Sequence, residues 1–193
     1  MTWEEALLTL ARAVTVLLPI LLSGLFFIAC MKKRWLLVLN KPMDFGLKIG
    51  GKRLFGQNKN WRGAVIYLTG GTAITLVLHY LSLSQPWVAP VFAENPWLLG
   101  PLCCAGYILG ELVNSFIKRR LDIDPGTRAK SSAGQAIQAF FDNADGAIGY
   151  GLVLNLLFLP QGAYLYLALV LALAVHAGSD VLMRKLSLKH KKS

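Results

Sequence analysis

Long apolar stretches separated by basic segments are the feature of this sequence that most restricts its fold. The first stretch runs from Ala13 to Met31, nineteen residues without a charge. As a helix it is long enough to cross a hydrocarbon core about 30 Å thick. Four further stretches follow at 64–83, 97–117, 139–159 and 163–183. The pattern predicts an all-α integral membrane protein with five transmembrane helices in a single membrane domain over residues 1–193.

The composition agrees with a membrane protein. Hydrophobic residues make up 55% of the chain, charged residues only 16%, and the mean hydropathy is +0.51. The net charge of +10 at pH 7 would suggest nucleic acid as a partner if the protein were soluble. Here the basic residues collect between the apolar stretches, so we expect membrane lipids as partners and no nucleic acid. The three cysteines lie in apolar runs without zinc-site spacing and are expected to serve packing.

The placement of the basic residues predicts the topology. Nine Lys and Arg lie in residues 32–63, five in 118–130 and five in the tail after the last stretch, which leaves Arg12 alone on the other side. The positive-inside rule puts these segments in the cytoplasm and the N-terminus outside. We therefore expect a multi-pass protein of the cytoplasmic (inner) membrane whose C-terminus faces the cytoplasm. Residues 2–12 are expected to form a separate short amphipathic helix at the interface.

Two polar stripes interrupt the apolar pattern between residues 110 and 145. Glu111, Asn114, Ser115 and Lys118 fall three or four residues apart and share one helix face, and Gln135, Gln138, Asp142 and Asp145 share a face of the next helix. An ionisable side chain at the centre of a membrane helix costs roughly 2.5–3.5 kcal/mol on insertion scales. The stripes therefore indicate a site. The second of these helices is expected to start near Ser131 or Ser132 and to project its first turns toward the cytoplasm.

Two functional cytoplasmic loops, 32–63 and 118–138, flank these helices. The first contains Asp44 and a glycine-rich basic segment, GGKRLFGQNKNWRG, whose N–H groups and cations suit an anion. Taken alone, such a loop more often sets topology or contacts anionic lipid. Asp142 and Asp145 lie three apart on one face and can share Mg²⁺, which prefers oxygen ligands and often bridges to phosphates. Together these features predict a metal–phosphate site.

Four motifs occur in a fixed order that resembles a known family. They are K-N-W-R-G at Lys59–Gly63, G-E-L-x-x-S-x-x-K-R at Gly110–Arg119, P-G at Pro125–Gly126 and D-x-x-D at Asp142–Asp145. The set resembles CDP-archaeol synthase, a family related to phosphatidate cytidylyltransferase (CDP-diacylglycerol synthase). The P-x-D-x-G segment at 42–46 and the five expected spans are similar to the archaeal branch. The resemblance covers roughly residues 40–150.

The resemblance implies a nucleotidyltransferase with Mg²⁺ as cofactor. In this family CTP and an isoprenoid ether or diacyl glycerol phosphate give a CDP-lipid and pyrophosphate. Carried onto this chain, the implied catalytic residues are Lys118, Arg119, Asp142 and Asp145. The implied metal ligands are Asp142, Asp145 and Glu111, and the implied substrate-binding residues are Asp44, Lys59, Asn60, Arg62, Asn114 and Ser115. Asn60 replaces a hydroxyl residue of the family pattern and Glu111 an aspartate. The lipid acceptor and the formation of a homo-oligomer stay open.

Two other functions remain as alternatives. The CDP-alcohol phosphotransferases open with D-x-x-D-G, as at Asp142–Gly146, but their pattern requires A-R and two further aspartates. Here Gly149 and Tyr150 follow, and no acid appears before Asp180. A small transporter or membrane scaffold would need polar residues that continue to the outer side, whereas these stop near the cytoplasmic third. The sequence therefore favours a CTP:lipid-phosphate cytidylyltransferase of phospholipid biosynthesis.

Overall fold

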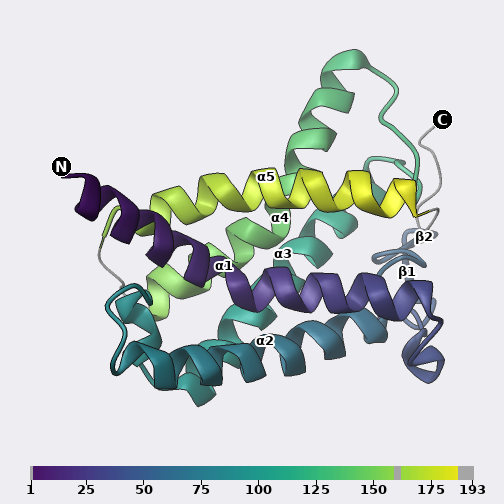
Figure 1. Cartoon of the computed structure of the whole chain (residues 1–193). Coiled ribbons are helices and arrows are strands. Elements are labelled where there is room, and N and C mark those ends of the chain that lie inside the picture. Colours follow the sequence, from purple (N-terminus) through teal and green to yellow (C-terminus); the bar gives the residue numbers. More distant parts are fainter. Residues whose placement is uncertain (1, 159–161, 187–193) are drawn as a thin grey trace.

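The computed structural model describes residues 2–158 and 162–186, and most of them are helical. The elements are α1 (Trp3–Lys32), η1 (Leu37–Leu39), β1 (Lys48–Ile49), β2 (Lys52–Arg53), α2 (Trp61–Ser82), η2 (Pro90–Ala93), α3 (Pro96–Arg120), α4 (Ser132–Phe158) and α5 (Tyr164–Lys185). Each long helix packs on the next in the chain, and α5 returns to α1, so the five close into a bundle (Figure 1). The expected all-α fold class is confirmed.

Three of the described helices, α1, α2 and α3, are long and apolar enough to cross a membrane. The five helices lie where the sequence predicted five spans, but α4 carries the polar stripe and α5 contains only a shorter apolar segment, Tyr164–Val175. The membrane character of the chain is thus supported by three helices. The turn around 160–161 and the basic tail from residue 187 lie outside the described residues.

Helix α1 is continuous from Trp3, so the expectation of a separate interfacial helix over residues 2–12 is wrong. A capping box explains the early start: the Thr2 hydroxyl accepts from the Glu5 N–H at 3.2 Å, and the Glu5 carboxylate accepts from the Thr2 N–H at 2.8 Å. Nothing between residues 12 and 13 breaks the helix. Instead α1 bends near its middle (Figure 1), where Pro19 lies and the Ser23 hydroxyl donates to the Pro19 carbonyl at 2.6 Å.

The hydrophobic core lies mainly where the first half of α1 meets the α2–α3 connection. Phe92 of η2 and Leu99 of α3 are almost fully buried there, and Ala89 donates its N–H to the Thr15 hydroxyl of α1 at 3.0 Å. Tyr150 and Leu154 extend the same cluster along α4. This core fixes one end of the bundle. The polar residues of α3 and α4 gather toward the other end, where the chain leaves α1 and α3.

Helices α3 and α4 cross with their backbones in direct contact, because glycines meet at the crossing. A Cβ on Gly110 of α3 would overlap the carbonyl oxygen of Asp145, and a Cβ on Gly149 of α4 would overlap that of Gly106. The Tyr107 ring occupies the space that a side chain at Gly146 would need. Small residues allow this approach between membrane helices. The crossing places Asp145 directly beside Gly110 and so beside Glu111.

The start of α4 matches its prediction. Its first helical residue is Ser132, and the preceding Ser131 accepts a hydrogen bond from the Gly134 N–H at 3.1 Å. The first turns of α4 extend away from the other helices (Figure 1). The loop from Leu121 to Ser131 therefore connects the end of α3 with a helix start that stands apart from the bundle, and it bounds a space between the two helices.

Candidate active site

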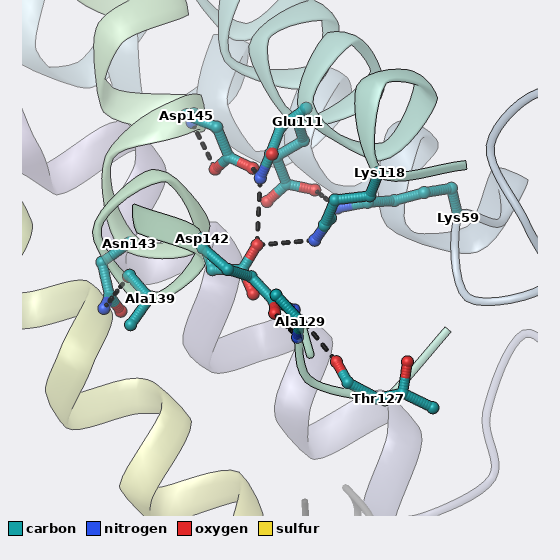
Figure 2. A network of polar contacts seen from close by, with 12 residues as sticks. Lys59, Glu111, Lys118, Thr127, Ala129, Ala139, Asp142, Asn143 and Asp145 are labelled. Carbon is teal, nitrogen blue, oxygen red and sulfur yellow. Dashed lines mark hydrogen bonds and ion pairs between the residues drawn. The ribbon is translucent and has the colours of Figure 1, made fainter. Parts of the chain in front are cut away.

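The two predicted polar stripes meet across the α3–α4 crossing. The Asn114 amide donates to Asp142 Oδ1 at 3.0 Å and to Asp145 Oδ2 at 2.7 Å, and Lys118 Nζ lies 2.5 Å from Asp142 Oδ1 (Figure 2). Asn114 and Lys118 are one helical turn apart on α3, and the two aspartates are one turn apart on α4, so one face of each helix supplies the set. The structure thus brings four of the predicted site residues together.

Lys59 reaches the same place from the first loop. Its Nζ lies 2.5 Å from Glu111 Oε2, and Figure 2 shows this pair beside Asp145. Burial would lower the pKa of the Lys59 ammonium, but the charges of Glu111, Asp145 and Asp142 outweigh it and raise the pKa. Lys59 is therefore a permanent cation at neutral pH. Lys59, two residues before α2, therefore interacts electrostatically with all three predicted metal carboxylates.

The donor set suits Mg²⁺ in part. No group of three or more His, Cys, Asp and Glu side chains in residues 2–158 and 162–186 is arranged to hold a metal ion. Mg²⁺ usually needs only one or two carboxylates, with water and substrate phosphates completing its octahedron. Asp142 and Asp145 each direct an oxygen at the same Asn114 amide, so their carboxylates converge. Two hard oxygen donors of this kind fit the ion, whereas Glu111 is paired with Lys59.

Arg119 carries buried donors without an acceptor. The residue is 8% exposed, and within the described part of the chain its Nε and Nη1 atoms have no hydrogen-bond partner. A buried donor without a partner typically costs about 1–3 kcal/mol. The guanidinium lies beside Gly56 of the first loop, where an added Cβ would sit 3.7 Å from Nε. The arrangement suits an anion that approaches between the two loops.

Asp44 is buried at the centre of the first loop. Its carboxylate accepts from Arg53 and from the N–H groups of Gly46, Phe55 and Gly56, and its side chain is 0% exposed. Burial alone would raise the pKa of Asp44, but these hydrogen bonds together outweigh it and hold the pKa well below the usual range. Asp44 was expected to bind substrate directly. Its contacts organise the loop that carries Lys59, and the substrate contact stays a prediction.

Asn60 and Arg62 also make contacts within the fold. Asn60 caps α2 by accepting from the Gly63 N–H at 3.0 Å, a role that its side-chain oxygen performs as a hydroxyl would. Arg62 is buried against the Phe27 ring of α1 and donates to the Trp35 carbonyl at 3.3 Å. Ser115 is buried in α3. The substrate contacts predicted for these three residues remain predictions.

Arg120 is a functional candidate that the sequence analysis missed. Its guanidinium donates to the carbonyl of Ile49 at 2.6 Å and to those of Lys52 and Arg53 at 3.0 and 2.8 Å. In return, Lys52 Nζ donates to the Arg120 carbonyl at 3.3 Å and pairs with Asp122 at 2.6 Å. The β1–β2 hairpin is thereby fastened to the end of α3. A third basic residue after Lys118 and Arg119 gave no separate signal in the sequence.

Gln138 fastens the second loop in a similar way. Its side-chain oxygen accepts from the Ala129 N–H at 2.8 Å, and its amide donates to the Thr127 carbonyl at 3.0 Å. Gln138 itself is 9% exposed. Its place on the polar stripe of α4 marked it as part of a site. The contact with the loop could not be read from the spacing.

A cavity of about 1070 Å³ lies between α3, α4 and the second loop. Its walls are mostly apolar, and they include Leu109, Val113, Ile117, Phe141, Ile148 and Leu152. Asn114, Lys118 and Asp145 line one part of it, together with loop residues from Thr127 to Ser131. The carboxylate–amide–ammonium network therefore borders a long apolar space. Such a space suits a ligand with one charged end and a hydrocarbon body.

Comparison with known proteins identifies relatives over most of the chain. A family model described as CarS-like CDP-archaeol synthase matches residues 17–192. The CDP-archaeol synthase of Pyrococcus furiosus is 31% identical over 156 residues, which cover 77% of this chain and 81% of the relative. That of Saccharolobus islandicus is 28% identical over 151 residues, 77% of this chain and 80% of the relative. Both alignments cover most of each chain.

A solved structure shares the fold. It is described as an intramembrane enzyme for archaeal membrane lipids biosynthesis, and it superposes with a TM-score of 0.61 over 89% of this chain and 94% of its own. The two sequences are 21% identical. At that identity the likeness speaks for the arrangement of the helices. It agrees with a bundle that lies within a membrane.

Proposed function

The chain belongs to the CarS-like CDP-archaeol synthase family, and from this membership we infer that it is a CTP-dependent cytidylyltransferase that converts a membrane lipid phosphate into a CDP-activated lipid and pyrophosphate. The observation that carries this conclusion is the family match over residues 17–192, which includes both polar helices and both loops. The CDP-alcohol phosphotransferase and transporter alternatives are therefore not retained.

The reaction is a substitution at phosphorus. A phosphate oxygen of the lipid forms a bond to the α-phosphorus of CTP while the bond from that phosphorus to the bridging oxygen of the β-phosphate breaks. The electron pair leaves with pyrophosphate, and the lipid keeps its own phosphate. Most of the charge lies on phosphate oxygens throughout, so the protein contributes mainly by positioning and by electrostatic stabilisation.

For CTP we propose a position between the two loops at the ends of α1 and α3. The two unpartnered donors of Arg119 support it, because they are buried beside Gly56 and suit phosphate oxygens. Lys118 and Lys59 add cations within the same network, where each now faces a carboxylate. The first loop contributes to CTP binding through its shape, which depends on Asp44, Asn60 and Arg62. Helix α3 contributes Asn114 and Ser115 to the same site.

For the cofactor we propose Mg²⁺ held by Asp142 and Asp145, with Glu111 as a third carboxylate beside them. The convergence of both aspartates on Asn114 supports the first two, since one oxygen of each already faces the same amide. When bound, Mg²⁺ supplies concentrated positive charge beside the transferring phosphate. In the structure the ammonium group of Lys118 pairs with Asp142 and that of Lys59 with Glu111. Both are free to turn to phosphate oxygens when the carboxylates take another cation.

For the acceptor we propose a glycerol phosphate with two long chains, either isoprenoid ethers or acyl esters. The apolar cavity between α3 and α4 supports this class, because it adjoins Asp145 and Lys118 and offers hydrocarbon walls. The curated relatives are named for archaeol, a lipid of this general form. The phosphate end of the acceptor would meet CTP at the network, with its chains along the helices.

For the membrane we propose five spans, with the N-terminus outside and both loops in the cytoplasm. The distribution of Lys and Arg supports the orientation, and the positions of five bundled helices support the number. In this arrangement the network of Figure 2 lies near the cytoplasmic side, where CTP is available.

The function is tested with purified protein, labelled CTP and a panel of lipid phosphates. We expect a labelled CDP-lipid and pyrophosphate with at least one dialkyl or diacyl glycerol phosphate, and no product with the matching glycerol lipid that lacks a phosphate. The panel also identifies the preferred chains. Labelled product with the phosphate-free lipid, or none with any member of the panel, would contradict the conclusion.

A further inference from the structure

Two cations of the second loop line the cavity, and the charge of one of them, Lys130, helps to lower the pKa of the Asp122 carboxyl. Arg128 and Lys130 both border it, and both are exposed. Within residues 2–158 and 162–186, no hydrogen bond or ion pair involves either side chain. They were not among the predicted site residues, because their spacing in the loop matched no motif. Their position at the edge of an apolar cavity suits them to bind an anionic group of a ligand in that cavity.

Arg128 is held in place by its neighbours on both sides. Gln138 binds the Thr127 carbonyl and the Ala129 N–H, so the backbone on either side of Arg128 is fixed to α4. Thr127 also donates its hydroxyl to the Asp124 carbonyl at 3.0 Å. Gln138 lies one helical turn before Asp142 on α4, and Figure 2 shows Thr127 and Ala129 in the same view as Asp142. The loop therefore presents Arg128 at the cavity from a fixed backbone.

The other charged side chains that border the cavity have partners: Asp122 pairs with Lys52, and Asp145 accepts a hydrogen bond from the Asn114 amide. Lys118 is paired with Asp142, and Lys59 with Glu111. Arg128 and Lys130 together leave two positive charges at the cavity edge. A phosphate monoester carries about −1.5 to −2 near neutral pH, which two cations balance. The adjoining walls are apolar, so a phosphate bound here is one attached to a hydrocarbon body.

We propose that Arg128 and Lys130 form the binding site for the phosphate of the lipid acceptor, positioned by Gln138. This inference rests on the proposed function. Arg119 lies beside Gly56 of the first loop, whereas Arg128 and Lys130 border the cavity, so the two substrates are recognised by different cations. The planar guanidinium of Arg128 suits two phosphate oxygens at once, and Lys130 adds a point charge.

The kinetic test compares Arg128→Gln and Lys130→Gln with the wild type in mixed micelles. We expect Arg128→Gln to raise the KM for the lipid phosphate about tenfold, as the loss of a charge-assisted hydrogen bond would, and to leave the KM for CTP within about twofold. Arg128→Lys should recover part of the loss. Gln138→Ala should raise the same KM, because it releases the loop on both sides of Arg128.

Lys41→Gln serves as the matched control. Lys41 is an exposed basic residue of the first loop that does not border the cavity, and its removal should leave both KM values unchanged. A binding measurement without CTP complements the kinetics: the lipid phosphate should raise the thermal midpoint of the wild type more than that of Arg128→Gln. A glycerol lipid without phosphate should shift the thermal midpoints of the wild type and Arg128→Gln by the same amount.

The outcomes distinguish this inference from the proposed function. If the wild type turns over a lipid phosphate but Arg128→Gln and Lys130→Gln keep its lipid KM, the inference fails and the function stands. A rise in the KM for CTP instead would assign the two cations to the triphosphate and overturn the inference as well. If the wild type turns over no lipid phosphate, the proposed function fails.

Discussion

Among single residues, Asp44 makes the densest set of contacts in the first loop. One carboxylate receives a guanidinium and three backbone N–H groups. A carboxylate with so many donors is strongly favoured in its charged form. Through Phe55 and Gly56 it also sets the path of the chain toward Lys59. The loop's shape thus depends on the ionisation of one buried group.

We expect Asp44→Asn to lower the stability of the protein by about 3 kcal/mol, because Arg53 loses its buried partner. The native pKa of Asp44 is lowered, so its contribution is present above the unfolded value of about 3.9 and is lost as the pH falls below it. Thermal unfolding in detergent between neutral and acidic pH measures both effects. The Asp44→Asn variant should lack the part of the wild-type stability that is lost on acidification.

Asp122→Asn is the control for Asp44→Asn. Asp122 pairs with Lys52, but its side chain is 70% exposed, and solvent screens an exposed pair so that it adds little to stability. We expect a small change in its thermal midpoint. Equal losses in the two variants would show that Asp44 does not organise the loop.

Glu111 gives a second prediction for a single residue. If it assists Asp142 and Asp145 with Mg²⁺, Glu111→Gln should raise the Mg²⁺ concentration for half-maximal turnover about tenfold, and Glu111→Asp should be milder. If Glu111 only pairs with Lys59, the Gln variant should melt earlier in detergent because a partly buried cation is left unmatched. An unchanged Mg²⁺ dependence would remove Glu111 from the metal site.

Among the elements, the α3–α4 crossing determines the geometry of the site. The glycines at the crossing bring the backbone of Asp145 against Gly110, and the polar faces of both helices then converge on Asn114. The C-terminal end of α3 also receives the β1–β2 hairpin through Arg120. Both loops therefore depend on α3 for their position relative to the carboxylates.

We expect Gly149→Ala to separate α3 from α4, because its methyl group meets the carbonyl oxygen of Gly106. Overpacking of this kind costs about 1–3 kcal/mol, and the displaced aspartates should reduce turnover. Gly151→Ala is the matched control on the same helix: a Cβ there meets no atom within 4 Å, and alanine favours helix by about 1 kcal/mol. Comparable thermal midpoints and turnover for the two variants would contradict the close crossing.

The sequence predicted the elements better than their contacts. Apolar run lengths placed α2 and α3 within a few residues, because the boundaries follow from caps and charges at the membrane surface. The sequence predicts a helix that ends at Arg12, whereas the Thr2 capping box begins a helix that continues through Arg12 to Lys32. The hydrogen bonds of Asp44, Arg120 and Gln138 join residues distant in the chain, and helical spacing carries no information about them.

For the site too, the sequence predicted which residues share a helix face better than it predicted contacts between distant segments. The spacing of Asn114 and Lys118 on one helix and of the two aspartates on the next was sufficient to predict that they share faces, and the structure joins them. The pairing of Glu111 with Lys59 depends on how the loop folds back. No spacing rule relates those two residues.

At the scale of the whole molecule, the bundle has an apolar core near the α2–α3 connection and a polar network toward the end that holds both loops. In the proposed topology, which puts the loops in the cytoplasm, CTP and the lipid phosphate reach the network from different phases. The native cysteines Cys30, Cys103 and Cys104 are buried. Introduced cysteines can therefore report the orientation with little background.

We expect Ser84→Cys to react with a membrane-impermeant thiol reagent in intact cells, and Lys48→Cys to react only after lysis. Both positions are exposed, and the proposed topology puts Ser84 outside and Lys48 in the cytoplasm. The cysteine-containing wild type gives the background labelling. Labelling of Lys48→Cys in intact cells would reverse the orientation and separate the network from CTP.

The most direct test of the account is the turnover of labelled CTP by Asp145→Asn at saturating lipid phosphate and Mg²⁺. Asparagine keeps the size of the side chain and removes its charge, so the fold should persist, as judged by the thermal midpoint in detergent. We expect formation of the CDP-lipid to fall by about a hundredfold or more. A folded Asp145→Asn protein with near wild-type turnover would contradict the claim that cytidylyl transfer takes place at the α3–α4 network.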